Sequence, residues 1–138
     1  MQIENPVIRE WFWAFDNDTA AFEALLHPDI DWFPIDENYG HLHGIDAALR
    51  NRNEWLEAWE DHEMDVEQVA AGGDSAVVAV HITAQGRSSG ARADLDFYVH
   101  VKVRDDKVVH LHDYDHPATA LEAAGLSPGR PPGTPRSA

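Results

Sequence analysis

Residues 93–103 have the sequence ADLDFYVHVKV, which is the clearest structural signal in the chain. Apolar and polar side chains alternate along this stretch, as expected for a β-strand that buries one face and exposes the other. Phe97 and Val99 belong to the apolar series, whereas Asp96 and His100 belong to the opposite series. We therefore predict a strand with one face toward a core and the other toward solvent or a partner.

Further strands are predicted on both sides of this stretch. The charged residues at 104–107 favour a turn, after which 108–114 forms a last strand. On the other side, 76–84 is rich in β-branched residues. A turn with the sequence GGD at 72–74 separates it from an alternating stretch at 64–69. The second half of the chain is thus expected to form four consecutive strands.

The first half of the chain carries helical patterns. Pro6 suits a first helical turn, and apolar residues recur at helical spacing as far as Phe15. Asp18 or Thr19 can cap a second, short helix that ends before Pro28.

A short strand at 30–35 and a long helix complete the predicted elements. The helix begins at 44–46 and extends to about Asp61, with Trp59 on its apolar side and Arg52 on its solvent side. Helices followed by a run of strands predict an α+β fold. We expect a strongly curved mixed or antiparallel sheet, wrapped around the N-terminal helices and one long helix, with a small-molecule pocket at its open end.

Length and composition limit the class of protein. A chain of 138 residues predicts one domain, which we place at 1–126, followed by a tail at 127–138 that is rich in proline and glycine. We see no secretory leader and no apolar run long enough for a membrane helix, so a cytoplasmic protein is expected. The net charge of −15 disfavours nucleic acid and anionic membranes as partners. The chain has no cysteine, which excludes thiol catalysis, and we expect no cofactor.

Several short segments carry a resemblance to a known family. They are ALLHPDIDW at 24–32, HG at 43–44, WLEAW at 55–59, VRDDKVV at 103–109 and Tyr114. In this pattern the chain resembles the SnoaL-like branch of the nuclear transport factor 2-like (NTF2-like) superfamily, which includes ketosteroid isomerases, polyketide cyclases and limonene-epoxide hydrolases. The resemblance implies a cone-shaped fold with an internal pocket, and a homodimer formed through the outer face of the sheet.

The resemblance also implies candidate catalytic residues. Asp113, followed by Tyr114, matches the water-activating aspartate of the epoxide hydrolases, whereas their charged partner residues fall near His81. The hydrogen-bond donors of the ketosteroid isomerases fall near Trp11 and Val99, so this chain lacks their phenol and their second carboxylic acid.

We therefore expect Asp113 to act as a general base, with His81 facing the same cavity as its partner or proton shuttle. The alternative is that Asp113 is only a structural hydrogen-bond acceptor. The residues expected to bind the substrate are Trp11, Trp32, Phe97, Val99 and, beside Asp113, Tyr114. This site predicts a cofactor-independent isomerase, cyclase or hydrolase acting on an apolar cyclic or polyketide-like compound. The alternative function is a non-catalytic module for ligand binding or dimerisation.

Histidine pairs raise the question of a metal. The segments HLH at 41–43 and HLH at 110–112 each place two imidazoles on one side of an extended chain, a spacing that can chelate zinc. The acids close to them in sequence are Asp36, Asp113 and Asp115. Side chains alternate along a strand, so His110 and His112 point outward if Asp113 points inward. We therefore expect no metal site. The outer-face residues are expected to form the homodimer surface or to be solvated: Tyr98, His100, His110 and His112.

Overall fold

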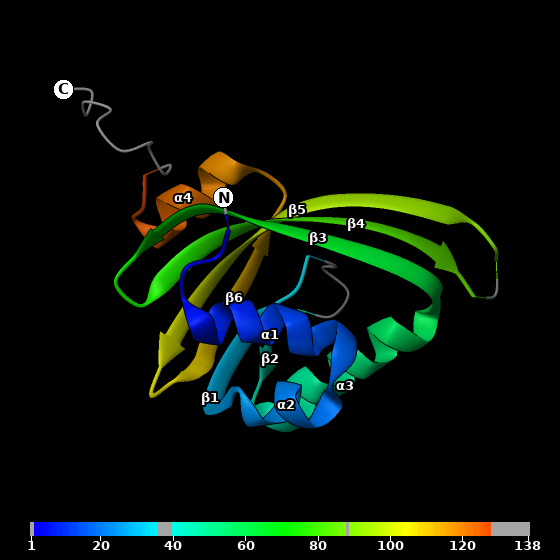
Figure 1. The fold of residues 1–138 in the computed structure, drawn as a ribbon, viewed down its shortest axis with the longest axis horizontal. Coiled ribbons are helices and arrows are strands. Elements are labelled where there is room, and N and C mark those ends of the chain that lie inside the picture. The colour runs from blue at the N-terminus through cyan, green and yellow to red at the C-terminus, as the bar shows by residue number, and fades with distance from the viewer. Residues whose placement is uncertain (1, 36–39, 88, 128–138) are drawn as a thin grey trace.

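A computed structural model describes residues 2–35, 40–87 and 89–127 of the chain (Figure 1). Asp36 lies outside these residues, as does the predicted tail from residue 128 onward. No helix of the described residues is long and apolar enough to cross a membrane.

Two capped helices open the chain. Helix α1 (Pro6–Asn17) begins after Asn5, whose side chain accepts hydrogen bonds from the backbone N–H groups of Val7 and Ile8. Helix α2 (Thr19–Ala24) begins after Asp18, whose carboxylate accepts from the N–H of Ala21. Both caps satisfy N–H groups that have no partner within the helix.

Within the described residues, six strands form one curved, unclosed sheet. They are β1 (Leu26–Phe33), β2 (Leu42–His43), β3 (Trp59–Gly72), β4 (Ser75–Gly86), β5 (Arg92–Arg104) and β6 (Lys107–Tyr114). Their order in the sheet is β2-β1-β6-β5-β4-β3. Strand β1 pairs with β6 in parallel, and every other neighbouring pair is antiparallel. The predicted α+β fold with a curved mixed sheet is confirmed.

Strand β1 begins four residues before the predicted strand, because its pairing with β6 already starts at Leu26, opposite Val108. Pro28 lies within β1, where the register between β1 and β6 is irregular. Proline has no N–H to donate, so it is tolerated at such an irregular point.

The long helix α3 (Ile45–Ala58) ends earlier than predicted, because Trp59 pairs with Gly86 and starts strand β3. The prediction for Arg52 is also wrong, since this side chain is buried. Its guanidinium donates to the carbonyl oxygen of Phe15 at 3.0 Å and to the hydroxyl of Thr19 at 2.7 Å. Arg52 thus ties α3 to the end of α1, a role that its position in a helical pattern does not reveal.

The helices occupy two sides of the sheet. Helices α1, α2 and α3 lie together against one face, and α4 (Pro117–Ala124) lies on the other side of the long strands (Figure 1). The main core fills the space between the first three helices and the sheet and includes Trp11, Phe22, Val78 and Val101. This arrangement gives the sheet an inner face toward α1–α3 and an outer face that α4 covers in part.

Candidate functional site

A cavity of about 380 Å³ lies between the inner face of the sheet and helices α1 and α3. Its wall is mostly apolar and aromatic, and it includes four of the residues that the sequence suggested: Trp11, Trp32, Phe97 and Val99. Among the described residues that line the cavity, the polar side chains are Asn51, Glu54 and Asp113, apart from the indole groups. A cavity of this size and character suits a small, flat, apolar molecule.

Asp113 contributes its carboxyl group to the cavity wall from strand β6. Its Oδ2 accepts a hydrogen bond of 3.0 Å from the backbone N–H of Ile35, and its residue partner on strand β5 is Val99. The side chain retains some exposure toward the cavity, but protein atoms surround it. This desolvation raises the pKa of Asp113 to about 7, against the opposing effect of the Ile35 N–H. At neutral pH the group can therefore both accept and donate a proton.

Two indole groups in the cavity wall keep unused hydrogen-bond donors. The Nε1 atoms of Trp11 and Trp32 are buried and have no hydrogen-bond partner among the described residues. The two rings pack edge to face, with centroids 5.9 Å apart. The Trp32 N–H lowers the pKa of the Asp113 carboxyl, although its geometry falls short of a hydrogen bond. Unpaired buried donors are uncommon, so these two are candidates for binding an oxygen atom of a ligand.

His81 does not face the cavity, contrary to the prediction. Its neighbours Val80 and Ile82 line the cavity, and side chains alternate along a strand, so His81 points to the outer face. There its Nδ1 hydrogen-bonds to Asp96 at 2.6 Å and its Nε2 lies 3.3 Å from Asp94. The hydrogen bond to Asp96 raises the pKa of His81. The Asp113–His81 pair therefore does not exist in the structure.

Tyr114 is also misplaced by the prediction. It follows Asp113 directly on β6, so it projects from the opposite face and stacks on His112, with ring centroids 4.1 Å apart and an interplanar angle of 8°. Tyr114 cannot orient Asp113 from there.

Comparison with known proteins agrees with this geometry. The model of the SnoaL-like domain matches residues 8–111. The chain belongs to the SnoaL-like domain family. This result confirms the resemblance drawn from the sequence, whereas no curated protein matches the chain.

Solved structures share the fold of this SnoaL-like chain. An NTF2-like protein of unknown function from Burkholderia pseudomallei is 21% identical, with a TM-score of 0.68 over 84% of this chain and 92% of that one. A candidate SnoaL-like polyketide cyclase from a Jannaschia species is 18% identical, with a TM-score of 0.68 over 90% and 96%. TerC, which was co-crystallised with polyporic acid, is 20% identical, with a TM-score of 0.67 over 86% and 95%. At these identities the likeness establishes the fold alone.

The outer face of this SnoaL-like sheet carries a band of stacked rings. Phe33 stacks on His41 at 4.4 Å and on His112 at 4.7 Å between ring centroids. His110 packs against the neighbouring ring of His100, with centroids 5.2 Å apart. The prediction of an outward band of histidines therefore holds for His110 and His112, and the homodimer through this face stays a prediction.

His100 differs from the rest of the band because it is buried, with 9% of its surface exposed. Helix α4 packs on β4, β5 and β6, and His100 lies opposite the buried Val77. Burial lowers the pKa of His100 to about 4, and its Nε2 has no partner among the described residues. The expectation that His100 is solvated or open to a dimer partner is thus wrong.

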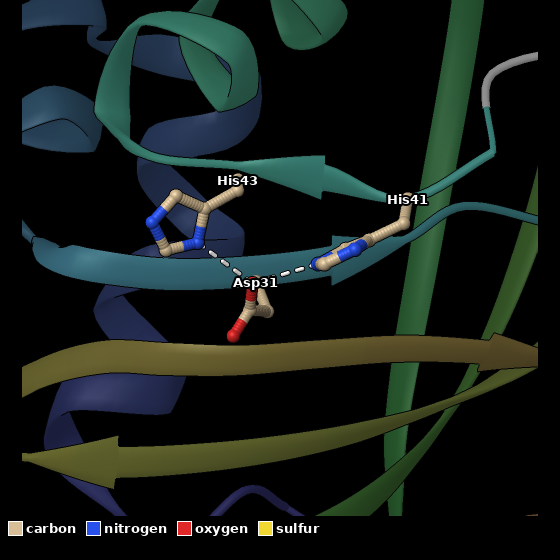
Figure 2. Close-up of side chains that lie close together, drawn as sticks. All are labelled: Asp31, His41 and His43. Atoms are coloured by element: carbon tan, nitrogen blue, oxygen red, sulfur yellow. Dashed lines mark hydrogen bonds and ion pairs between the residues drawn. The ribbon is translucent and has the colours of Figure 1, made fainter.

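Sequence reasoning missed Asp31 altogether. In the structure, His41 and His43 both hydrogen-bond to one oxygen of Asp31 on the outer face (Figure 2). The sequence signal was the alternation of Ile30, Asp31 and Trp32, which turns Asp31 outward when its apolar neighbours are buried.

Proposed function

We propose that this SnoaL-like protein binds a flat, apolar cyclic or polyketide-like molecule in the inner cavity and transfers a proton with Asp113. The observation that carries the proposal is a single carboxyl group with a pKa near 7 in an aromatic cavity wall. Perturbed carboxyl groups in apolar cavities are typical of general acid–base sites.

The shape and chemistry of the cavity support an aromatic or conjugated ligand. Trp11, Trp32 and Phe97 offer ring faces and edges, and the volume of about 380 Å³ accommodates a small polycyclic compound. The related structure of TerC, which was crystallised with polyporic acid, makes that compound a reasonable first probe.

The proposed reaction begins with Asp113 as its carboxylate. It takes a proton from a carbon next to a carbonyl group, and the electron pair of the C–H bond moves onto the carbonyl oxygen to give an enolate. In an isomerisation, Asp113 returns the proton to a different carbon. In a cyclisation, the enolate carbon forms a bond to a second carbonyl carbon, and the resulting alkoxide takes the proton from Asp113. In a hydrolysis, the carboxylate takes a proton from water while the water oxygen forms a bond to an electrophilic carbon. The bond from that carbon to its leaving oxygen breaks, and the leaving oxygen takes the proton from Asp113.

The unused indole donors suit the developing negative charge. An enolate or alkoxide oxygen needs hydrogen-bond donors, and the N–H groups of Trp11 and Trp32 are unpaired. His81, which we expected to partner Asp113 or to shuttle its proton, lies on the other face of the sheet and takes no part in this proposal.

A second candidate function is ligand binding without catalysis. The observation that favours it is the scarcity of titratable groups: among the described lining residues only Asp113 and the exposed Glu54 can exchange a proton. Asp113 would then serve only to accept a hydrogen bond from the ligand or from Ile35.

Two measurements on the same compounds distinguish these functions. Binding is measured by quenching of the tryptophan fluorescence, first with polyporic acid and then with flat aromatic ketones and 1,3-diketones. Proton transfer is measured by NMR, as deuterium exchange at the carbon next to the carbonyl in D₂O. We expect bound ketones to exchange at least tenfold faster with the protein, and Asp113→Asn to remove the acceleration while binding persists.

A matched control blocks the cavity instead of removing the acid. Val99→Trp places a bulky side chain beside Asp113 on the same face of the sheet, so it should fill the cavity and abolish both binding and exchange. Binding without exchange for every compound would leave the non-catalytic function. Failure of all compounds to bind would refute both.

A further inference from the structure

The outer face of the sheet holds a second constellation, which is separate from the cavity. It consists of Asp31 on β1 with His41 and His43 from the segment that forms β2 (Figure 2). Neither the proposed proton transfer nor the ligand cavity uses these residues.

The sheet register brings the three side chains together. Asp31 lies directly opposite His43 in the antiparallel pairing of β1 with β2, so the two side chains project from the same face. His41 stands two residues before His43 and projects to the same side. Its ring is stacked on Phe33 with an interplanar angle of 5°, which fixes the direction of the imidazole.

The atoms that converge here are those of a metal-binding set. His41 Nε2 lies 2.7 Å and His43 Nδ1 lies 2.8 Å from the same Asp31 oxygen, and the three ligand atoms lie within 4.8 Å of one another. Tetrahedral zinc with bonds of about 2.0–2.1 Å needs ligand atoms about 3.3 Å apart. Each imidazole nitrogen would therefore move about half an ångström away from the Asp31 oxygen, and the two nitrogens would take positions about 3.3 Å from each other. We propose that Asp31, His41 and His43 bind a divalent transition-metal ion of the Zn²⁺ class, with one or more positions left for water or a further ligand.

The accessibility of the three side chains supports this inference. The side chains of Asp31, His41 and His43 retain 37%, 49% and 63% of their exposure, so an ion reaches them without any opening of the fold.

Further imidazoles lie in the same groove of the outer face. His110 is the partner of Asp31 across β1 and β6, on the side opposite His43. His100 also lines the groove, and its buried Nε2 lacks a partner among the described residues. Burial lowers the pKa of both His110 and His100.

Cations also line this groove. Lys102 and Arg104 lie on β5. In the sheet, strand β6 separates β5 from β1 and β2, where the proposed ligands lie. Lys102 and Arg104 oppose the binding of a cation, so the site depends on the carboxylate of Asp31. For this reason we assign the ion to the three residues at β1 and β2, and we assign no ligand role to His100 or His110. This inference revises the expectation of a protein without a metal.

The test is a titration of the full chain, free of any affinity tag and treated with chelator, with Zn²⁺ by calorimetry at pH 7.5. We expect one Zn²⁺ per chain. The double variant His41→Ala/His43→Ala and the near-isosteric Asp31→Asn should each bind at least tenfold more weakly. Both variants should keep the tryptophan fluorescence of the unsubstituted protein.

His81→Ala is the matched control, because it removes another outer-face histidine that contacts two aspartates. It should leave the Zn²⁺ titration unchanged. As a second readout, Co²⁺ should broaden the imidazole proton signals of His41 and His43 in the NMR spectrum, and those of His81 should stay sharp. No binding at 100 μM Zn²⁺, or equal binding by the double variant, would overturn the proposal. Even if the double variant fails to fold, Asp31→Asn and the Co²⁺ spectrum decide the question.

Discussion

The substitution Asp113→Asn should change how the stability of the protein depends on pH. The pKa of Asp113 rises from 3.8 to about 7 in the folded protein because the carboxyl group is desolvated. The folded state therefore holds this proton more tightly than the unfolded chain does. It follows that the group stabilises the fold fully below pH 3.8, and that this contribution is lost as pH rises to about 7. Asparagine carries no such titration.

The size of the effect follows from the two pKa values. Each tenfold difference in proton affinity corresponds to about 1.4 kcal/mol, which gives at most about 4 kcal/mol over the whole range. Between pH 5 and pH 8 the expected change is at most roughly 2 to 3 kcal/mol.

The assay is urea unfolding of both proteins at pH 5, 6, 7 and 8, followed by the fluorescence of the five tryptophans. All other titrations cancel in the difference between the two free energies of unfolding. The variant should gain stability relative to the original protein as pH rises from 5 to 7, and the difference should then level off. Glu54→Gln is the matched control, since it removes an exposed carboxylate that lines the same cavity, and surface changes rarely exceed about 0.5 kcal/mol. If the difference in free energy of unfolding between the original protein and Asp113→Asn did not vary with pH, the reasoning about the buried acid would be refuted.

Three other substitutions test the packing and capping. Arg52→Met leaves the Phe15 carbonyl and the Thr19 hydroxyl without their donor, so the free energy of unfolding should fall by about 3 kcal/mol; an unchanged urea midpoint would contradict this role. Asn5→Ala removes the cap of α1 and should cost about 1 kcal/mol in the same assay, whereas no loss would mean that the cap is dispensable. His100 has a folded-state pKa of about 4 against 6.5 when unfolded, so its contribution to stability is present above pH 6.5 and lost as pH falls to 4. As pH falls from 6.5 to 4, the free energy of unfolding of His100→Leu should therefore decrease less than that of the original protein, by up to about 3 kcal/mol. If the free energies of unfolding of the two proteins changed equally with pH, this role of His100 would be contradicted.

The order of elements and the faces of most strands follow from local sequence. The alternation along 93–103 placed Phe97 and Val99 on the inner face, and Asp113 lies in the cavity wall as the family resemblance implied. The helix caps at Asn5 and Asp18 are likewise local, because a cap joins residues only two or three apart. These features depend on the period of the backbone and on short-range hydrogen bonds, which a sequence displays directly.

Other features depend on contacts between distant segments. Strand β4 is apolar on both faces, so its sequence does not tell which face meets the helices, and the side of His81 was predicted wrongly. Arg52 is buried because the end of α1 and the start of α2 supply acceptors for it, which lie 33 to 38 residues away in the chain. The meeting of Asp31 with His41 and His43 requires the register of β1 with the two-residue strand β2. The sequence alone thus determines the fold class, which follows from periodic patterns, and it indicates the acid in the cavity through the resemblance to the SnoaL-like family. The tertiary structure decides which groups surround that acid and which histidines converge, because those distances are set by strand register and helix packing.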